Sequence, residues 1–260
     1  PPQVWASRKY RINLIKKYVD KVLCIFPFEK QLYAQYGIDV HYCGHPLVSQ
    51  LPPAVNKQEF FTKHGLDISK KLVSVFPGSR VFELKQLMPV FKDTVKKLRE
   101  RHPDLQFCMS HAPNLSDDVY KKYLGNDCDI KVIKGENQAL LSVSDALILA
   151  SGTVALEACL YKTPMIIAYR GPKLFYWIYL LVRCIERVSL PNIIADKFIV
   201  PEIIQDRVSV LNITYEIEEL LYNQARREKT INELVNVREM LSNKNSALEV
   251  AKVIDMELFS

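Results

Sequence analysis

The sequence predicts an α/β protein whose parallel sheet is covered by helices on both faces. Short apolar runs alternate with amphipathic segments along most of the 260 residues, a pattern typical of parallel strands joined by helical crossovers. The runs are hydrophobic throughout, as expected for strands that are buried on both faces. Hydrophobic residues make up 48% and charged residues 25% of the chain, which is the balance of a folded globular protein.

Individual elements follow from these patterns. Apolar residues recur at spacings of three and four across residues 83–101, which predicts a long helix. His102 and Pro103 end it, because proline disfavours helical geometry in the residue before it. After about residue 214 the chain is helical and polar. The expected strands are residues 21–26, 40–43, 72–76, 105–109, 130–133, 146–149 and 165–169.

The order of elements divides the chain. Residues 45–53 contain three prolines and no periodicity, so we interpret them as a linker. Residues 1–44 hold about two strands and two helices, too little for a core of their own, and we expect them to be the remnant of a second Rossmann-like domain. Residues 54–212 would form one complete Rossmann-like domain, and 213–260 a helical tail. Since the first residue is proline, we expect a fragment of a longer protein.

The charge and the cysteine content limit the range of possible functions. The net charge of +6 indicates an anionic partner, such as nucleic acid, an acidic membrane face or a phosphorylated substrate, although a mildly basic enzyme explains it equally well. Nucleic-acid-binding motifs are missing. The six cysteines form no CxxC pair and do not cluster with histidines, which argues against a metal site or a redox dithiol. The longest apolar stretch, residues 174–182, is about half of a membrane span.

The first candidate site is the turn Phe76-Pro77-Gly78-Ser79-Arg80, which follows an expected strand and opens the long helix. Ligands of open parallel sheets bind at this end of the strands. Gly78 permits close approach of a ligand to the backbone, Ser79 can cap the helix, and Arg80 can donate two hydrogen bonds to a phosphate. A plain helix start with a solvated arginine explains the pattern about as well.

The second candidate is Ala150-Ser151-Gly152-Thr153, again between a strand and a helix. Free N–H groups and the helix dipole would hold a pyrophosphate there without a metal. Glu157, one turn further, could accept hydrogen bonds from both hydroxyls of a ribose. The pattern is not GxGxxG, so the dinucleotide fingerprint is absent. A capped helix with one solvated glutamate is a slightly favoured alternative.

Two further segments attract attention. The motif Ser189-Leu190-Pro191-Asn192 and the later Val200-Pro201-Glu202 suggest a rigid loop beside a site, or a connector with turn chemistry. Residues 173–183 combine aromatic and leucine side chains with flanking basic residues, which is typical of a helix that lies in a membrane interface. A buried helix or a subunit contact would have the same composition. The residues expected to contact the membrane or acyl chains are Phe175, Trp177, Ile178 and Leu181.

Several blocks together resemble a known family. PPQVWASRKYRINLIKKYVDKVLCIFPFE, YGIDVHYCGHPL, FPGSRVFELKQLMPVF, ASGTVALEACLYKTPMIIAYR and SLPNIIADKFIVPEIIQ are similar, in this order, to lipid-A-disaccharide synthase over roughly residues 1–206. The resemblance implies an inverting glycosyltransferase of the two-domain B type. It would transfer 2,3-diacylglucosamine from its UDP derivative to 2,3-diacylglucosamine 1-phosphate and release UDP. The implied UDP-sugar-binding residues are Gly78, Ser79, Arg80, Ser151, Gly152, Thr153, Glu157, Asn192, Glu202 and Gln205.

The resemblance also implies what this chain lacks and where it works. Residues 54–212 would be the donor-binding domain, and the catalytic base would belong to the missing amino-terminal domain, so the chain alone should bind nucleotide and transfer sugar very poorly. No cofactor, metal or nucleic acid is expected. The protein would lie on the inner face of the cytoplasmic membrane, on an anionic surface. The tail, which would pack toward the amino-terminal domain, could be exchanged in a homodimer.

Other functions fit parts of the pattern. Another UDP-sugar enzyme of the same fold, such as a UDP-N-acetylglucosamine 2-epimerase or a peptidoglycan-pathway transferase, shares the turns and the glutamate but not the PQVWAS, GHPL and SLPN blocks together. A non-catalytic module that binds nucleotide or a lipid surface belongs to a different class. A nicotinamide dehydrogenase is disfavoured by the missing GxGxxG.

Overall fold

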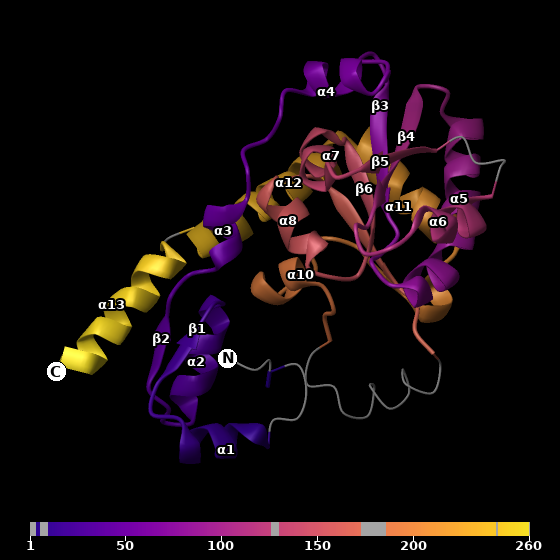
Figure 1. Cartoon of the computed structure of the whole chain (residues 1–260). Coiled ribbons are helices and arrows are strands. Elements are labelled where there is room, and N and C mark those ends of the chain that lie inside the picture. Colours follow the sequence, from indigo (N-terminus) through magenta and orange to yellow (C-terminus); the bar gives the residue numbers. More distant parts are fainter. Residues whose placement is uncertain (1–3, 6–9, 126–129, 173–185, 243, 260) are drawn as a thin grey trace. The chain divides into compact units, whose positions relative to one another are not determined.

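The computed structural model describes residues 4–5, 10–125, 130–172, 186–242 and 244–259. The chain forms two compact units, which are described separately. The first consists of the described residues within Pro1–Leu51, Lys173–Arg187 and Asn236–Ser260, and the second comprises Pro52–Pro172 and Val188–Val235. Figure 1 shows the elements of both units along the chain.

The second unit contains a six-stranded parallel sheet of order β5-β4-β3-β6-β7-β8. The order reverses between β3 and β6, so this sheet has its topological switch point there, and ligands of such sheets bind beyond the carboxyl ends of the strands at that point. The predicted α/β class with a parallel sheet is confirmed. The strands are β3 (Lys71–Phe76), β4 (Leu105–His111), β5 (Lys131–Lys134), β6 (Ala146–Ala150), β7 (Met165–Tyr169) and β8 (Glu202–Ile204).

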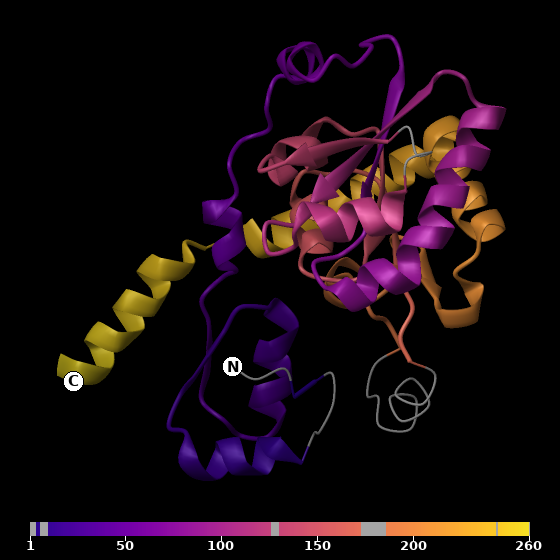
Figure 2. The same cartoon turned by 45° about the vertical axis from the view of Figure 1, so that its right-hand side comes forward.

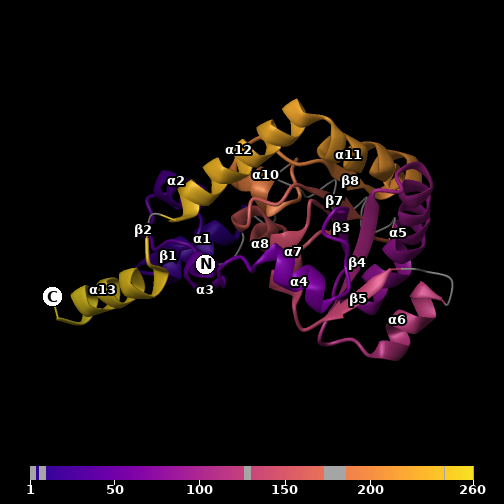
Figure 3. The same ribbon diagram turned by 90° about the horizontal axis from the view of Figure 1, so that it is seen from above.

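Helices cover both faces of this sheet, and Figure 3 shows them on either side of the strands. On one face α5 contacts β4 and β6, and α11 contacts β6 and β7. On the other face α7 lies against β3, β4 and β5, while α8 lies against β7. The helices of the unit are α4 (Lys57–Lys63), α5 (Val81–Arg101), α6 (Asp117–Leu124), α7 (Asn137–Val143), α8 (Val154–Leu160), α10 (Leu190–Ile194), the 3₁₀ turn η1 (Gln205–Arg207), α11 (Val210–Tyr222) and the first part of α12 (Gln224–Ser242).

The long helix α5 anchors the core of the second unit. Leu84, Phe91 and Leu98 lie on one stripe, all with no exposed surface, and pack with Val73 and Ile148 of the central strands. The helix continues through Pro89 and ends at Arg101, and the N–H of its C-cap residue, His102, donates to the carbonyl of Leu98 at 2.8 Å. The predicted helix is therefore present and begins two residues before the predicted start.

The first unit contains a two-stranded parallel sheet of β1 (Val22–Cys24) and β2 (Val40–Tyr42). Its small core includes Ile12, Val22 and Tyr33. Its helices are α1 (Arg11–Tyr18), α2 (Pro27–Gln35), α3 (Pro46–Gln50) and α13 (Ser246–Phe259). Figure 2 shows these elements from a second direction. The segment expected to be a linker thus contains the short helix α3, whose N-cap His45 accepts a hydrogen bond at Nδ1 from the Leu47 N–H at 3.2 Å.

A buried carboxylate fixes the start of α2 in the first unit. Glu29 is only 1% exposed and accepts hydrogen bonds from Trp5 Nε1 at 3.0 Å and from the N–H groups of Ile25 and Phe26, both at 3.2 Å. Burial raises the pKa of this carboxyl group, and the three donors partly oppose the rise. No helix in the described part of the chain is long and apolar enough to cross a membrane.

We predict that Phe91→Ala lowers the free energy of unfolding by about 3–5 kcal/mol, because it leaves a cavity in the core under the sheet. Phe82→Ala, on the same helix but 41% exposed, is the matched control and should cost well under half as much. Chemical denaturation followed by circular dichroism measures both values. Equal losses in the two variants would contradict the central role of the α5 stripe.

Candidate functional site

The loop after β3 has a conformation that requires glycine. Gly78 has φ +107°, a region that residues with a side chain rarely adopt. A Cβ placed on Gly78 would lie 2.2 Å from Oε2 and 2.8 Å from Cβ of Glu83. The backbone therefore approaches the Glu83 side chain closely, and any larger residue would push the two apart.

Glu83 holds this loop in place. Its Oε2 accepts hydrogen bonds from the N–H groups of Ser79 at 2.9 Å and Arg80 at 3.2 Å, and its Oε1 pairs with Arg80 Nη1 at 2.9 Å. The expectation that Ser79 caps the helix is wrong, because Arg80 occupies the N-cap position and Glu83 supplies the capping carboxylate. Asn114 Nδ2 also donates to the Ser79 carbonyl at 2.7 Å. Glutamate is favoured at the third position of a helix, where it caps the first N–H groups. The position of Glu83 in the sequence could therefore have identified it as the capping residue.

The loop after β6 lies at the next strand of the sheet. The Ser151 N–H donates to the Ala168 carbonyl at 3.0 Å, and α8 begins at Val154. In the first turn of α8 the N–H groups of Ala155 and Leu156 donate to the carbonyls of Gly152 and Thr153, at 3.3 and 2.9 Å. The N–H groups of residues 152–154, which precede them, have no acceptor within the described residues. Glu157 is half-buried, and burial raises the pKa of its carboxyl group, while a hydrogen bond with Gln138 acts in the opposite direction.

The two loops line one cavity of about 420 Å³. Its walls come from the carboxyl ends of β3, β4 and β6 and from the helices that follow, which is where the switch point of the sheet predicts a ligand. Seven of the predicted residues lie together here, namely Gly78, Ser79, Arg80, Ser151, Gly152, Thr153 and Glu157. The other lining residues are Phe76, Glu83, Ser110, Ala112, Pro113, Asn137, Ala150 and Val154.

Asn137 is a lining residue that the sequence reasoning missed. It is the first residue of α7, and its Oδ1 is buried with no hydrogen-bond partner in the described part of the protein. An unsatisfied buried acceptor is costly, so a ligand that donates a hydrogen bond would stabilise this wall of the cavity. The sequence did contain a signal for this residue, because Asn137 comes shortly after an expected strand and therefore lies at the ligand end of the sheet.

Asn192 and Glu202 form a separate cluster that does not line this cavity. Asn192 is fully buried, donates to Glu202 Oε1 at 2.8 Å, and accepts from the N–H groups of Ile199 at 2.8 Å and Val200 at 3.0 Å. Glu202 also accepts from the N–H groups of Val188 at 2.9 Å and Ser189 at 2.8 Å. These bonds hold the connection between α10 and β8, and a contact of either residue with a ligand stays a prediction.

Gln205 lies at the end of β8 and is also outside the cavity. It has φ +53°, its Oε1 accepts from the Gly171 N–H at 3.1 Å, and its Nε2 is buried without a partner in the described residues. A donor therefore remains available beside the end of β7. The four residues predicted to contact acyl chains, Phe175, Trp177, Ile178 and Leu181, lie outside the described residues.

The arrangement can bind a group that carries both negative charge and hydroxyls. Arg80 is exposed at the cavity, and its pair with Glu83 leaves other guanidinium donors for an anion. The N–H groups of residues 152–154, at the start of α8, offer further donors. Glu157 faces the same cavity as a hydrogen-bond acceptor. Within the described residues, no group of three or more histidine, cysteine or acidic side chains could hold a metal ion.

Solved structures share this fold. An S. aureus MnaA–UDP co-structure matches 95% of this chain and 61% of its own with a TM-score of 0.62 and 16% sequence identity. A UDP-GlcNAc 2-epimerase from Neisseria meningitidis bound to UDP-GlcNAc matches 87% of this chain and 59% of its own, with a TM-score of 0.59 and 14% identity. These two proteins and this chain therefore have the same Rossmann-like fold.

Sequence comparison identifies the family. The family model for lipid-A-disaccharide synthetase matches residues 1–254, and the chain belongs to this family. It is 36% identical to the lipid-A-disaccharide synthase of Geobacter sulfurreducens over 97% of its length, and 34% identical to that of Coxiella burnetii over 100%. The chain spans 66% and 68% of the length of these two relatives.

We predict that Glu83→Ala lowers the free energy of unfolding by about 1–2 kcal/mol, since it leaves the Ser79 and Arg80 N–H groups without their acceptor. Glu100→Ala, an exposed position on the same helix, should change it by less than about 0.5 kcal/mol. Urea denaturation gives both values. No difference between the variants would show that the carboxylate does not hold the loop.

Asn192→Ala separates two roles for that residue. If it holds the connection between α10 and β8, the variant loses about 2–4 kcal/mol of unfolding free energy, because buried N–H groups lose their acceptor. Asn212→Ala, whose amide donates only to the Arg207 carbonyl at 2.7 Å at the surface, should cost less than about 1 kcal/mol. An unchanged unfolding free energy with weakened UDP binding would instead assign Asn192 to the ligand.

Proposed function

We propose that this chain is the UDP-sugar-binding part of a lipid-A-disaccharide synthase. The reaction would transfer 2,3-diacylglucosamine from its UDP derivative to 2,3-diacylglucosamine 1-phosphate, with release of UDP. Membership of the family supports the reaction. The observation that carries the binding role is the cavity at the sheet's switch point, which both predicted turns line and which has the cation of Arg80 and the carboxylate of Glu157 in its walls.

Each side chain of the cavity has a role in this proposal. Departure of UDP builds negative charge on the diphosphate, and Arg80 together with the N–H groups of residues 152–154 would stabilise that charge. Glu157 would accept hydrogen bonds from the ribose hydroxyls. Asn137 would accept one from a donor on the nucleotide, which would satisfy its buried Oδ1. This set of donors needs no divalent ion.

Transfer itself would require more than this chain. The relatives are about half as long again, since the chain spans 66% of the first. We propose that the general base and the acceptor-side residues belong to the part of the relatives that this chain does not cover, so the chain binds nucleotide and transfers sugar very poorly. An inverting mechanism fits that division, because the acceptor hydroxyl then attacks the sugar opposite the departing UDP.

The proposal extends to the protein's surroundings. Both substrates carry acyl chains, so the protein would work against the inner face of the cytoplasmic membrane, with residues 173–183 at an anionic lipid surface. The helical tail would contact the amino-terminal domain, or be exchanged between two copies in a homodimer.

A calorimetric titration with UDP, UMP and NADH tests the binding role. We expect saturable binding of UDP, weaker binding of UMP, since it lacks one phosphate, and none of NADH. Glu157→Ala should weaken UDP binding at least about tenfold through lost hydrogen bonds to the ribose, with little change in melting temperature. A large loss of stability with unchanged UDP affinity would make Glu157 a structural residue.

The pH dependence of nucleoside binding reports on the same carboxyl group. Burial raises the pKa of Glu157 above its ordinary value of 4.5, so the folded protein takes up this proton at a higher pH than an exposed glutamate does. Protonation removes the acceptor, and the affinity for uridine, which has no phosphate to titrate, should therefore fall as the pH drops through that raised pKa. Glu157→Gln should bind weakly with no such dependence. Parallel pH profiles of the two proteins would contradict the role.

A further inference from the structure

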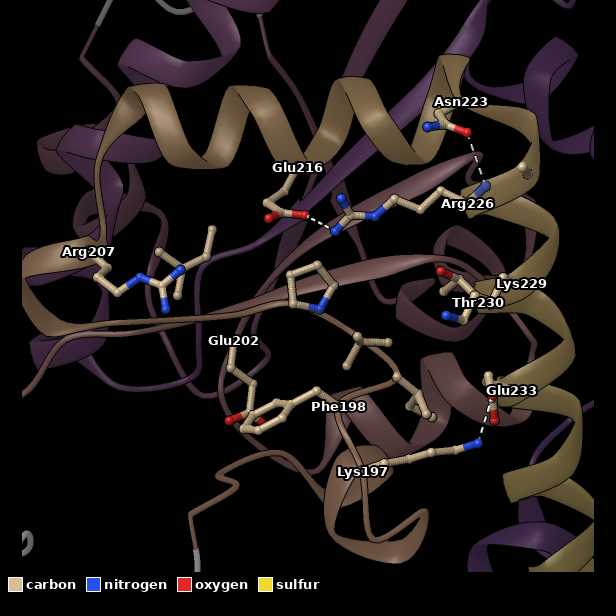
Figure 4. Close-up of a pocket in the computed structure, with 15 residues that line it drawn as sticks. Lys197, Phe198, Glu202, Arg207, Glu216, Asn223, Arg226, Lys229, Thr230 and Glu233 are labelled. Carbon is tan, nitrogen blue, oxygen red and sulfur yellow. Dashed lines mark hydrogen bonds and ion pairs between the residues drawn. The ribbon is translucent and has the colours of Figure 1, made fainter.

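A second, larger hollow lies in the same unit and shares no lining residue with the cavity described above. We call it the α11–α12 groove. It has a volume of about 860 Å³ and lies between the connection from Lys197 to Ile203, the 3₁₀ turn η1, helix α11 and the first turns of α12. Figure 4 shows its side chains. Of its lining residues only Glu202 was predicted to contact the nucleotide sugar, and the others have no part in the nucleotide-binding role.

The charges of the groove are only partly compensated. Arg226 forms an ion pair with Glu216, and Lys197 forms one with Glu233 at 2.7 Å. Arg207 and Lys229 are exposed, and neither has an acidic partner within the described residues. In Figure 4 these two cations enter the groove from opposite sides. The groove therefore presents two separated positive charges that an anionic group would neutralise.

The remaining acid of the groove does not compete for these cations. The carboxylate of Glu202 accepts hydrogen bonds from Val188, Ser189 and Asn192, at distances between 2.7 and 2.9 Å. These donors fix its orientation toward the chain that precedes β8. It is therefore held by neutral groups and forms no ion pair with a cation of the groove in the described part.

An exposed aromatic ring lies beside these charges. Phe198 is 61% exposed and stands between Lys197 and the buried Ile199 and Val200. Figure 4 shows its ring next to Glu202, with Arg207 further along the same wall. A large apolar side chain exposed among cations is typical of a surface that meets both the acyl region and the anionic head groups of a membrane.

We propose that the α11–α12 groove binds the head group of an anionic lipid, with Arg207 and Lys229 at the phosphate and the Phe198 ring at the acyl boundary. A soluble phosphate would engage the cations alone, whereas a bilayer engages the cations together with the exposed part of the ring. The inference rests on the part of the proposed function that places the protein at a membrane, and it adds a surface that the sequence did not indicate. UDP binding does not depend on it.

Vesicle binding by the full chain tests the cations. We expect the chain to bind phosphatidylcholine vesicles only when they contain phosphatidylglycerol, and Arg207→Gln with Lys229→Gln to weaken binding at least about tenfold. Lys96→Gln with Lys121→Gln removes the same net charge from exposed positions outside the groove and should have a much smaller effect. Equal losses in the two double variants would overturn the proposal, because general charge attraction would then explain binding.

The aromatic ring gives a second, independent readout. Phe198→Ser should weaken vesicle binding severalfold, by a similar factor at low and high salt, since apolar contact is not screened. Tyr215→Ser, at a position 54% exposed on α11 and outside the groove, is the control. Binding of glycerol 3-phosphate that depends on Arg207, without vesicle binding, would replace the lipid with a soluble phosphate and overturn the proposal.

A UDP titration of the same variants separates the two hypotheses. The groove variants should retain wild-type UDP affinity, because they share no residue with the nucleotide cavity. If UDP fails to bind but vesicle binding still depends on Arg207 and Lys229, the nucleotide role fails and the lipid site stands. The reverse result leaves the nucleotide role intact and removes the lipid site.

Discussion

The pairing of β3 with β6 is the constraint on which the candidate site depends. These strands are distant in the sequence but hydrogen-bonded neighbours, in a register that runs from Val73 opposite Ala146 to Phe76 opposite Leu149. Because the strands are parallel and in step, both chains leave the sheet at the same edge. The loop that contains Arg80 and the loop that precedes Glu157 are thereby brought to one cavity. A slip of this register would separate them, and both strands are too deeply buried to slip without exposing their apolar side chains.

Much of this arrangement could be predicted from the sequence, because the signals were local. Short runs rich in apolar residues marked β3 to β7, and small residues after β3 and β6 marked the turns at the ligand end. The short strand β8 was not predicted, since three residues carry too little pattern. The sequence also could not show that β6 pairs with β3 and not with β5 in the sheet. The single cavity depends on this pairing. Strand order is set by the packing of helices on the two faces, which no local pattern reveals.

The predicted site residues differ in how well a sequence pattern can define their role. Arg80 and Glu157 lie within seven residues of the ends of β3 and β6, so the chain itself places them near the sheet edge. Asn192 and Glu202 are joined only by folding, and they satisfy each other and nearby N–H groups. A polar residue in a proline-rich loop gives the same pattern whether it faces a ligand or holds the loop. For Asn137 the decisive fact is an unsatisfied buried oxygen, which exists only once α7 is packed.

The contact between Gly78 and Glu83 limits how this loop can change over evolutionary time. Any side chain at position 78 would collide with the Glu83 carboxylate, yet a shorter residue at position 83 would leave the N–H groups of Ser79 and Arg80 unpaired. Each of these two substitutions is harmful for a different reason. A shorter residue at position 83 does not make a larger residue at position 78 neutral, because the N–H groups of Ser79 and Arg80 then have no acceptor. No single substitution at either position is therefore neutral. Glycine at position 78 and glutamate at position 83 should be conserved together in related sequences, even where the rest of the helix differs.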